Sequence, residues 1–369
     1  MEEAVSDVAW LRAMLRFESQ LALAEAELGI IPAQAAATIS AACADHEFDL
    51  AAIGAAAVES AQPVVAIVDA LRLALPDSDR AHVHFGATSQ DTMDTAMMLV
   101  ARDGLAALLA DLRSLANACA DLATRHRDTP MVGRTLLQRA EPITFGLKAA
   151  NWLLGILESR RLATAVRNNR LALQLGGAAG TLAAFGPRAF ELSANLARRL
   201  DLAATTLPWH GERSRVAEIA SVCAIASGSA GKVAHDLVLL AQTEVGEVSF
   251  RSPGRSSAMP HKRNPTAAIL AETCSRSVAG PVLVLIEAMR GDHERSAGAW
   301  QAEWPALTDA FRYTAGAVGH TLRAVTDLEV DPGQMLSNLH LAQGRGAATG
   351  AAGLLVDRAL DLYREECDD

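Results

Sequence analysis

Apolar residues recur at every third or fourth position along most of this chain, the spacing that places them on one face of an α-helix. The first such stretch, 7–28, carries leucine at this spacing from Leu11 to Leu28, with charged residues between. Pro32 follows and is expected to open a second helix, because a proline at the first helical position removes no hydrogen bond. The N-terminal region is therefore predicted to consist of short helices.

The apolar pattern then lengthens into four stretches of about 25 to 35 residues each, at 92–125, 142–169, 216–248 and 265–290. Helices of this length exceed the globular average and indicate a bundle of long helices. Small residues fill the segment 224–231, so neighbouring backbones can approach closely. Because such helices carry more apolar surface than one slender bundle covers, we expect copies of the chain to associate through the bundle.

Polar and glycine-rich segments interrupt this pattern. They lie at 86–91, 176–180, 207–210 and 252–260. The segment 176–180 has no following Lys-Ser/Thr and no preceding strand, so it is predicted to be a helix break near a site and not a phosphate loop.

Trp300 and Trp304, four residues apart, are expected to pack in the core and not to stack on a cofactor. Asn338 and the stretch 344–353 predict two small helices after Asp331.

Composition narrows the class of protein. Half of the 369 residues are hydrophobic, 21% are charged and 4% are aromatic, which excludes a disordered chain and favours packed helices. The net charge of −10 argues against nucleic acid and anionic membranes as partners. Five dispersed cysteines without a CxxC pair suit reduced thiols. With no leader-like segment and no uncharged apolar run of roughly 18 residues, we expect a cytoplasmic protein outside the membrane.

The densest polar segment is 254–265, which reads Gly-Arg-Ser-Ser-Ala-Met-Pro-His-Lys-Arg-Asn-Pro. Pro265 can start the next helix, so Lys262 and Asn264 stand at a helix N-terminus, where backbone N–H groups and the helix dipole favour an anion. The segment is therefore predicted to bind a polycarboxylate; the alternative is an ordinary solvated loop. Metal-ligand motifs such as HExxH or paired His and Cys do not occur, and neither a metal nor a cofactor is expected.

This segment resembles the signature of the fumarase/aspartase superfamily, GSSxMPxKxNP, and departs from it only at Arg255, where glycine is usual. Two more regions are similar to conserved regions of the superfamily, in the same order. They are 86–91 with 94–95, and 133–135 with residues 138, 142 and 145–146. The resemblance implies an all-α subunit of three domains, 1–91, 92–330 and 331–369, whose central long-helix bundle forms a homotetramer with sites shared between subunits.

Superfamily members make or break a C–N or C–O bond beta to a carboxylate through an aci-carboxylate intermediate. By resemblance, Ser256 is the catalytic base, with its pKa lowered by N–H groups of the loop and by Lys262. Lys262 and Asn264 would bind the carboxylate whose charge doubles in the transition state. Resemblance and residue chemistry together predict these substrate-binding residues: His84, Thr88, Ser89, Arg134, Thr135, Gln138, Arg213, Arg215, Ser257, Met259, His261, Asn264 and Arg295.

His210 is a further catalytic candidate. It follows a proline and a tryptophan in a loop, where a histidine can serve as a charge partner or an acid. The alternative is a histidine that only forms hydrogen bonds within the loop, and the sequence leaves both open.

The departures from the superfamily pattern are informative. Many of its lyases have a histidine directly after the Arg-Thr pair and a glutamate four residues after the Asn-Pro of the signature, and these positions are Leu136 and Ile269 here. The joint loss counts against fumarase, argininosuccinate lyase and ordinary adenylosuccinate lyase. Gly-Arg-Thr-Leu-Leu-Gln at 133–138 resembles instead the 3-carboxy-cis,cis-muconate cycloisomerase subgroup.

That resemblance implies a cycloisomerase that lactonises 3-carboxy-cis,cis-muconate to 4-carboxymuconolactone in the protocatechuate branch of the β-ketoadipate pathway. The nucleophile is a carboxylate of the substrate itself, so no dedicated acid for a leaving group is needed. The alternative is a C–N lyase that releases fumarate from a succinyl adduct, either adenylosuccinate or a nitrogenous succinate of secondary metabolism. A non-catalytic scaffold is disfavoured because Ser256, Lys262 and Asn264 are all present.

Overall fold

The computed structural model describes residues 1–343 and 348–368, and helices dominate it, which confirms the all-α prediction. The chain divides into two compact units, each built from three segments. Unit 1 comprises 1–107, 165–221 and 281–311, and unit 2 comprises 108–164, 222–280 and 312–369. The predicted three-domain division remains a prediction.

Helices of unit 1 come mainly from the N-terminal region. They are η1 (Glu2–Val5), α1 (Asp7–Glu27), α2 (Ala33–Asp45), α3 (Leu50–Ser60), α4 (Val64–Leu73), η2 (Arg80–His82), η3 (Ala183–Arg188) and α7 (Ala189–Leu200). Five helices contribute residues to both units: α5 (Ser89–Arg125), α6 (Phe145–Asn169), α8 (Ser214–Leu240), α10 (Ala279–Glu287) and α11 (Ala299–Thr326). The remaining elements belong to unit 2: β1 (Pro130–Thr135), β2 (Gln138–Thr144), β3 (Val248–Phe250), α9 (Thr266–Ser277), β4 (Leu328–Val330), α12 (Pro332–Gln343) and α13 (Ala352–Asp368).

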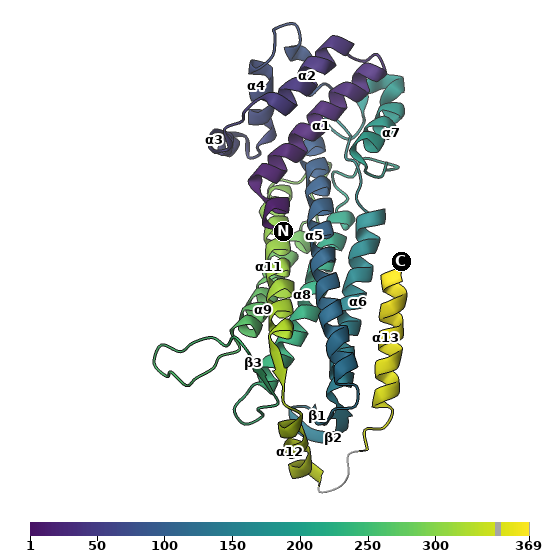
Figure 1. Cartoon of the computed structure of the whole chain (residues 1–369). Coiled ribbons are helices and arrows are strands. Elements are labelled where there is room, and N and C mark those ends of the chain that lie inside the picture. The colour runs from purple at the N-terminus through teal and green to yellow at the C-terminus, as the bar shows by residue number, and fades with distance from the viewer. Residues whose placement is uncertain (344–347, 369) are drawn as a thin grey trace. The chain divides into compact units, whose positions relative to one another are not determined.

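The first helix shows how the apolar pattern is used. The Ser6 hydroxyl accepts a hydrogen bond from the backbone N–H of Ala9 and so caps the start of α1. Phe17 and Leu21 lie on the buried face of α1, which packs against α2 and α7 (Figure 1). The predicted helix at 7–28 is thus confirmed to within one residue at its C-terminal end, and Pro32 is the N-cap of α2.

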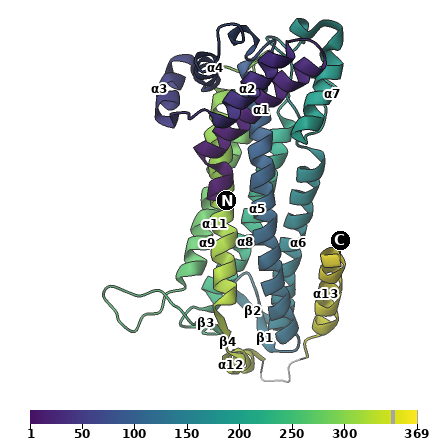
Figure 2. The same cartoon turned by 45° about the horizontal axis from the view of Figure 1, so that its top comes forward.

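Unit 2 contains short strands that the apolar pattern did not predict. Strands β1 and β2 form an antiparallel hairpin that contacts α12, and β3 pairs with β4 (Figure 2). The helix expected from residue 142 therefore begins only at Phe145, because residues 138–144 pair with β1. The hydroxyl of Thr144 then accepts from the Leu147 N–H and caps the start of α6.

Two other long helices differ from their predicted bounds. The helix expected at 216–248 ends at Leu240, since Gly246 adopts a positive φ and residues 248–250 enter β3. The helix expected at 265–290 is divided at Val278 into α9 and α10. Two small helices follow Asp331 as predicted, although residues 344–347 of the stretch between them lie outside the described part of the chain.

Two stretches are long and apolar enough to cross a membrane by length and composition alone. The stretch in α8 is 61% buried, as in the core helix of a globular protein. The stretch from Thr266 to Glu287 is only 17% buried. Helix α9 exposes Ile269 and Leu270, and α10 exposes Leu283, Val284 and Ile286. Within the described residues, these helices therefore present apolar side chains that the single chain does not cover.

Candidate active site

The signature segment forms a closed loop between β3 and α9 in unit 2. Gly254 and Asn264 join its ends by two backbone hydrogen bonds of 2.8 and 3.1 Å. A side chain at Gly254 would collide with Thr266, which explains why glycine stands at this position. Between these ends the chain extends away from the helices of unit 2 (Figure 2). The loop is therefore fixed at its base while most of its side chains are exposed.

Ser256 is held inside this loop by its own backbone. Its Oγ accepts hydrogen bonds from the N–H of Met259 at 3.1 Å and of Ala258 at 3.4 Å. Two donors on one hydroxyl oxygen stabilise negative charge there, which is what a serine base requires. Ser256 is half-buried, whereas Ser257, Met259, His261 and Lys262 are exposed and Asn264 precedes the N-cap of α9. Backbone N–H groups of the loop thus reach Ser256, while the effect of Lys262 on its pKa and the role of Ser256 as base remain proposals.

Region 86–95 of unit 1 is organised by Asp91. Its carboxylate accepts from the backbone N–H groups of Thr88, Gly176 and Gly177 at 2.9 to 3.0 Å. His210 contributes a fourth contact, with Nε2 2.7 Å from Oδ1. Asp91 is fully buried, so these bonds replace the hydration that the carboxylate loses. Asp91 therefore fixes the glycine-rich segment against the start of α5, a role the sequence did not reveal.

His210 is itself almost fully buried, at 5% exposed. Besides the bond to Asp91, its backbone carbonyl accepts from Gln90 Nε2. It also lines a hollow of about 230 Å³ together with Gly180 and Glu294. In this arrangement the hydrogen-bonded loop histidine is the better supported alternative, because the Nε2 nitrogen is already engaged. A catalytic role for His210 stays a prediction.

A second buried carboxylate, Asp94, holds Arg213 in place. The guanidinium of Arg213 makes contacts of 2.7 and 3.0 Å to Asp94 and pairs on its other side with Glu303. Arg213 is 3% exposed and lies over the ring of Trp209. Burial lowers the pKa of Arg213, but the two carboxylates outweigh this effect and raise it, so the side chain stays charged.

This network includes one of the candidates. Arg213 is predicted to bind substrate, and its N–H groups are directed to Asp94 and Glu303. A structural role is therefore the alternative, and contact with a substrate stays a prediction. Trp300 donates from Nε1 to Asp94 at 3.0 Å and packs edge-on against Trp304, as expected for core tryptophans. Asp94, Glu303 and Trp300 lie up to about 200 positions apart in the sequence, and local patterns could not bring them together.

Arg295 and Arg215 both form hydrogen bonds with groups of the protein itself. Arg295 donates to the side-chain oxygen of Gln90 at 2.9 Å and to the carbonyl of Ala178 at 3.2 Å. Arg215 donates to the carbonyl of Arg170, and its Nε is buried without a partner in the described part of the chain. Burial and the nearby Arg170 lower the pKa of Arg215. Contact of either arginine with a substrate remains a prediction.

The second region forms the tip of the β1–β2 hairpin in unit 2. Thr135 and Gln138 pair at its end, and Leu136 and Leu137 make the turn with φ of 50° and 61°. Leu136 is 96% exposed. Arg134 donates to Glu247 through two N–H groups at 2.9 and 2.7 Å, which ties β1 to the segment before β3. Arg134 is thus engaged within the fold, and Thr135 and Gln138 are left as the exposed polar groups of the tip.

Each unit carries part of the predicted set. Unit 1 holds His84, Thr88, Ser89, His210, Arg213, Arg215 and Arg295, whereas unit 2 holds Arg134, Thr135, Gln138, Ser256, Ser257, Met259, His261, Lys262 and Asn264. His84 and Ser89 line one hollow of unit 1. Among residues 1–343 and 348–368, no group of three or more metal-ligating side chains is present.

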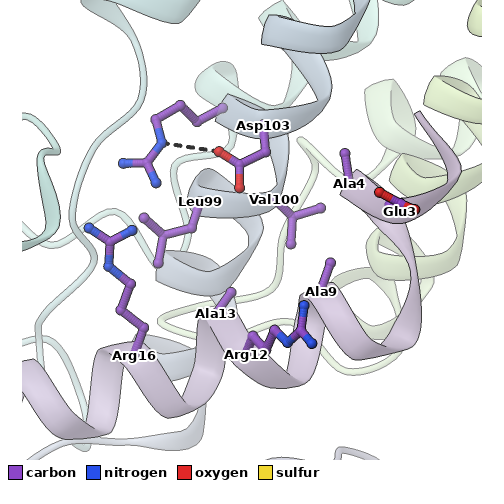
Figure 3. Close-up of a pocket in the computed structure, with 10 residues that line it drawn as sticks. Glu3, Ala4, Ala9, Arg12, Ala13, Arg16, Leu99, Val100 and Asp103 are labelled. Atoms are coloured by element: carbon purple, nitrogen blue, oxygen red, sulfur yellow. Dashed lines mark hydrogen bonds and ion pairs between the residues drawn. The ribbon is translucent and has the colours of Figure 1, made fainter. Parts of the chain in front are cut away.

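Another hollow of unit 1, about 210 Å³, lies between α1 and α5 and contains none of the predicted residues (Figure 3). Arg12, Arg16 and Arg102 line it together with Glu3 and Asp103. The Nε of Arg102 lies 3.4 Å from an oxygen of Asp103. Because acidic and basic side chains are mixed there, charge alone does not mark it as an anion site.

Comparison with known proteins points to the same family as the motif in the signature loop. A family model described as Lyase matches residues 2–280. The 3-carboxy-cis,cis-muconate cycloisomerase of Bradyrhizobium diazoefficiens is 43% identical over 97% of this chain and 81% of the relative. The nitrosuccinate lyase of Streptomyces davaonensis is 44% identical over 96% of this chain and 78% of the relative.

Solved structures give the same result. The 3-carboxy-cis,cis-muconate lactonizing enzyme from Pseudomonas putida superposes with a TM-score of 0.88 at 38% identity and covers 99% of this chain and 85% of that one. The family match, the relatives and the signature loop all point the same way. This chain therefore belongs to the lyase family and is an enzyme of the fumarase/aspartase superfamily.

Proposed function

We propose that this enzyme is a cycloisomerase that converts 3-carboxy-cis,cis-muconate into 4-carboxymuconolactone. The observation that carries the proposal is a stabilised Ser256 hydroxyl without the acid pair that lyases of the superfamily use for a leaving group. Ser256 has two backbone donors on its Oγ, while the positions of the superfamily's acid pair hold Leu136 and Ile269, both apolar and exposed. The similarity to several cycloisomerases supports the same reaction.

The reaction needs one proton donor and no leaving-group acid. A carboxylate oxygen of the substrate adds to the substrate's own double bond, a C–O bond forms, and the displaced π electrons move into the neighbouring carboxylate to give an aci-carboxylate. Ser256 Oγ–H then gives its proton to the carbon next to that carboxylate, and the lactone results. Because the nucleophile is tethered, the attack is intramolecular and strongly favoured by proximity.

The basic side chains of the loop suit this intermediate. Lys262 and Asn264 near the N-terminus of α9 would hold the carboxylate that becomes doubly negative. Thr88 and Ser89 from unit 1, and Thr135 and Gln138 from the hairpin tip, would hold the other carboxylates. In a tetramer with shared sites, these groups can come from different subunits.

A second candidate is a lyase that eliminates nitrite from a nitrosuccinate, because the relative with that name is as similar as the cycloisomerases. Nitrite is the conjugate base of a moderately strong acid and leaves without first being protonated. The replacement of the acid pair by Leu136 and Ile269 is therefore compatible with this reaction too. A leaving group such as the amine of adenylosuccinate is more basic and gains more from an acid.

An assay with both substrates separates the candidates. The purified protein is expected to remove the ultraviolet absorbance of 3-carboxy-cis,cis-muconate as the conjugated diene is lost, and to release no nitrite or fumarate from nitrosuccinate. Fumarate and nitrite formation with no change in the muconate absorbance would replace the first proposal by the second. The Ser256→Ala variant serves as the control for contaminating activity in both assays.

We further propose that the functional form is a homotetramer and that it works in the cytoplasm. The association is supported by the apolar surface of α9 and α10, which the single chain leaves uncovered. Sedimentation at micromolar concentration is expected to show a tetramer for the wild type and smaller species for Leu283→Glu, whose side chain is 60% exposed on α10. Val58→Glu introduces the same charge at an 81% exposed position on α3 and is the matched control. A wild-type monomer would refute the proposal.

A further inference from the structure

A buried carboxylate of α1 contacts a candidate substrate-binding histidine. Oε1 of Glu18 lies 2.8 Å from Nδ1 of His84. The same oxygen accepts a 2.8 Å hydrogen bond from the hydroxyl of Thr92 on α5. The Glu18 side chain is 1% exposed and that of His84 is 13% exposed. All three residues belong to unit 1, so this contact lies within one compact body.

The contact determines which edge of the imidazole is available. With Nδ1 directed at a carboxylate, Nδ1 carries a proton, and Nε2 is the nitrogen left for another partner. Nε2 has no hydrogen bond in the described part of the chain. His84 lines a hollow of about 140 Å³ together with Ser89, Arg72 and Asp69, and the 61% exposed carboxylate of Asp69 pairs with Arg72. The backbone of His84 is in the left-handed region, with φ of 60°, which is uncommon for a residue other than glycine.

The charges around the ring favour its protonated form. Burial opposes the charge, but the Glu18 carboxylate, its hydrogen bond and the more distant Asp91 together raise the pKa of His84. Arg72 of α4 acts in the opposite direction. Glu25 lies about two turns further along α1, on the same face as Glu18. Burial and the charge of Glu18 raise the pKa of Glu25 to about 9, so its carboxyl group is neutral near pH 7. Glu18 is therefore the main negative charge that faces His84.

Packing alone gives no reason to retain Glu18. Its second oxygen, Oε2, is buried without a protein partner in the described part of the chain, and a half-satisfied buried carboxylate destabilises a fold. A buried carboxylate with one unsatisfied oxygen, next to a histidine in the left-handed backbone region at the edge of a hollow, is the kind of arrangement found at functional sites.

We propose that Glu18 is a positioning residue that holds His84 as an imidazolium, with its Nε2–H presented to a carboxylate of the bound substrate. The proposal rests on the proposed function only in that the substrate is a polycarboxylate. Superfamily lyases that carry the acid pair join a histidine to a glutamate at the positions of Leu136 and Ile269. In this chain a histidine and a glutamate are joined instead at His84 and Glu18. There they would bind an anion and would not protonate a leaving group.

The test is the pH dependence of binding of a stable tricarboxylate, propane-1,2,3-tricarboxylate, measured by calorimetry on the intact protein. A histidine with a raised pKa binds an anion at low pH and releases it as the pH rises through that pKa. In the wild type, affinity is expected to fall only above the ordinary range of histidine. In Glu18→Gln the midpoint should move to lower pH, so binding should weaken several-fold at a pH between the two midpoints and stay unchanged well below both.

Three variants make the result specific. Thr92→Val removes the other hydrogen bond to Glu18 but keeps its charge, and it should leave the midpoint close to that of the wild type. Glu25→Gln changes another buried acid of α1 and should do the same. His84→Gln should abolish this transition altogether. A Glu18→Gln variant with an unchanged midpoint, whether or not its melting temperature shifts, would overturn the proposal and leave Glu18 a structural residue.

This measurement is independent of turnover. If the protein binds the tricarboxylate with the expected midpoint shift but converts no muconate, the proposed reaction fails while the role of Glu18 stands. If the muconate is lactonised and the midpoint does not move in Glu18→Gln, the reaction stands and the role of Glu18 fails.

Discussion

Replacement of Ser256 by alanine is expected to lower kcat by roughly 10²- to 10⁴-fold, the range measured when a general acid or base is removed. The substrate carboxylates are held by other groups, so binding of the tricarboxylate probe should be nearly intact. Steady-state kinetics with the muconate and calorimetry with the probe measure the two effects separately. A loss in kcat without a loss in affinity is the signature of a group that acts in the transition state.

The Oγ of Ser256 also accepts the two N–H bonds that shape its loop, so alanine could rearrange the loop and impair binding as well. Ser256→Thr retains the hydroxyl acceptor and should preserve the loop. Ser249→Ala removes a hydroxyl that donates to exposed Glu329 in β4 of the same unit, and should leave kcat unchanged. Wild-type turnover in Ser256→Ala would refute the assignment of Ser256 as the group that transfers the proton.

Replacement of Arg213 by methionine is expected to lower the free energy of unfolding by about 3 to 5 kcal/mol, because it leaves Asp94 and Glu303 buried without their shared counter-charge. Burial already raises the pKa of Glu303, and Arg213 is the group that opposes this effect. Denaturant unfolding at neutral pH measures the change. We also expect the loss to shrink at acid pH, where the carboxyl groups take up protons and need no partner.

Arg290→Met is the matched control. Arg290 is 80% exposed and pairs with Glu287, which is also exposed, so the same substitution there should change the free energy of unfolding by less than about 1 kcal/mol. Equal effects at the two positions would show that Arg213 contributes no more than a surface ion pair. Retained stability with lost substrate affinity would support the prediction that Arg213 binds substrate.

The long periodic helices could be predicted from the sequence because each one is specified by residues within a few turns of one another. The hairpin at 130–144 could not, since the pairing of Val132 with Pro142 depends on a partner strand and not on a local period. The division between α9 and α10 at Val278 was missed for a related reason. The apolar pattern runs on through it and gives no sign that the helix is interrupted there.

The candidate site shows the same contrast. The signature segment 254–265 is local, and the sequence alone located its helix N-terminus and its polar side chains. The networks around Asp91 and Asp94 are not local, because their partners come from segments 80 to 200 positions away. The residue type of Arg213 did not show whether its side chain is accessible to a substrate or is buried in ion pairs with Asp94 and Glu303.

The hairpin tip has a consequence for how such enzymes diversify. Leu136 projects into solvent and supports no part of the core, so an exchange at this position carries almost no folding penalty. By resemblance, many lyases of the superfamily carry the histidine of their acid pair at this position, so the expected loss of that acid falls at a place that the fold does not depend on. Relatives with nearly equal identity to this chain carry the names of different reactions, so percentage identity alone does not fix the substrate within this branch.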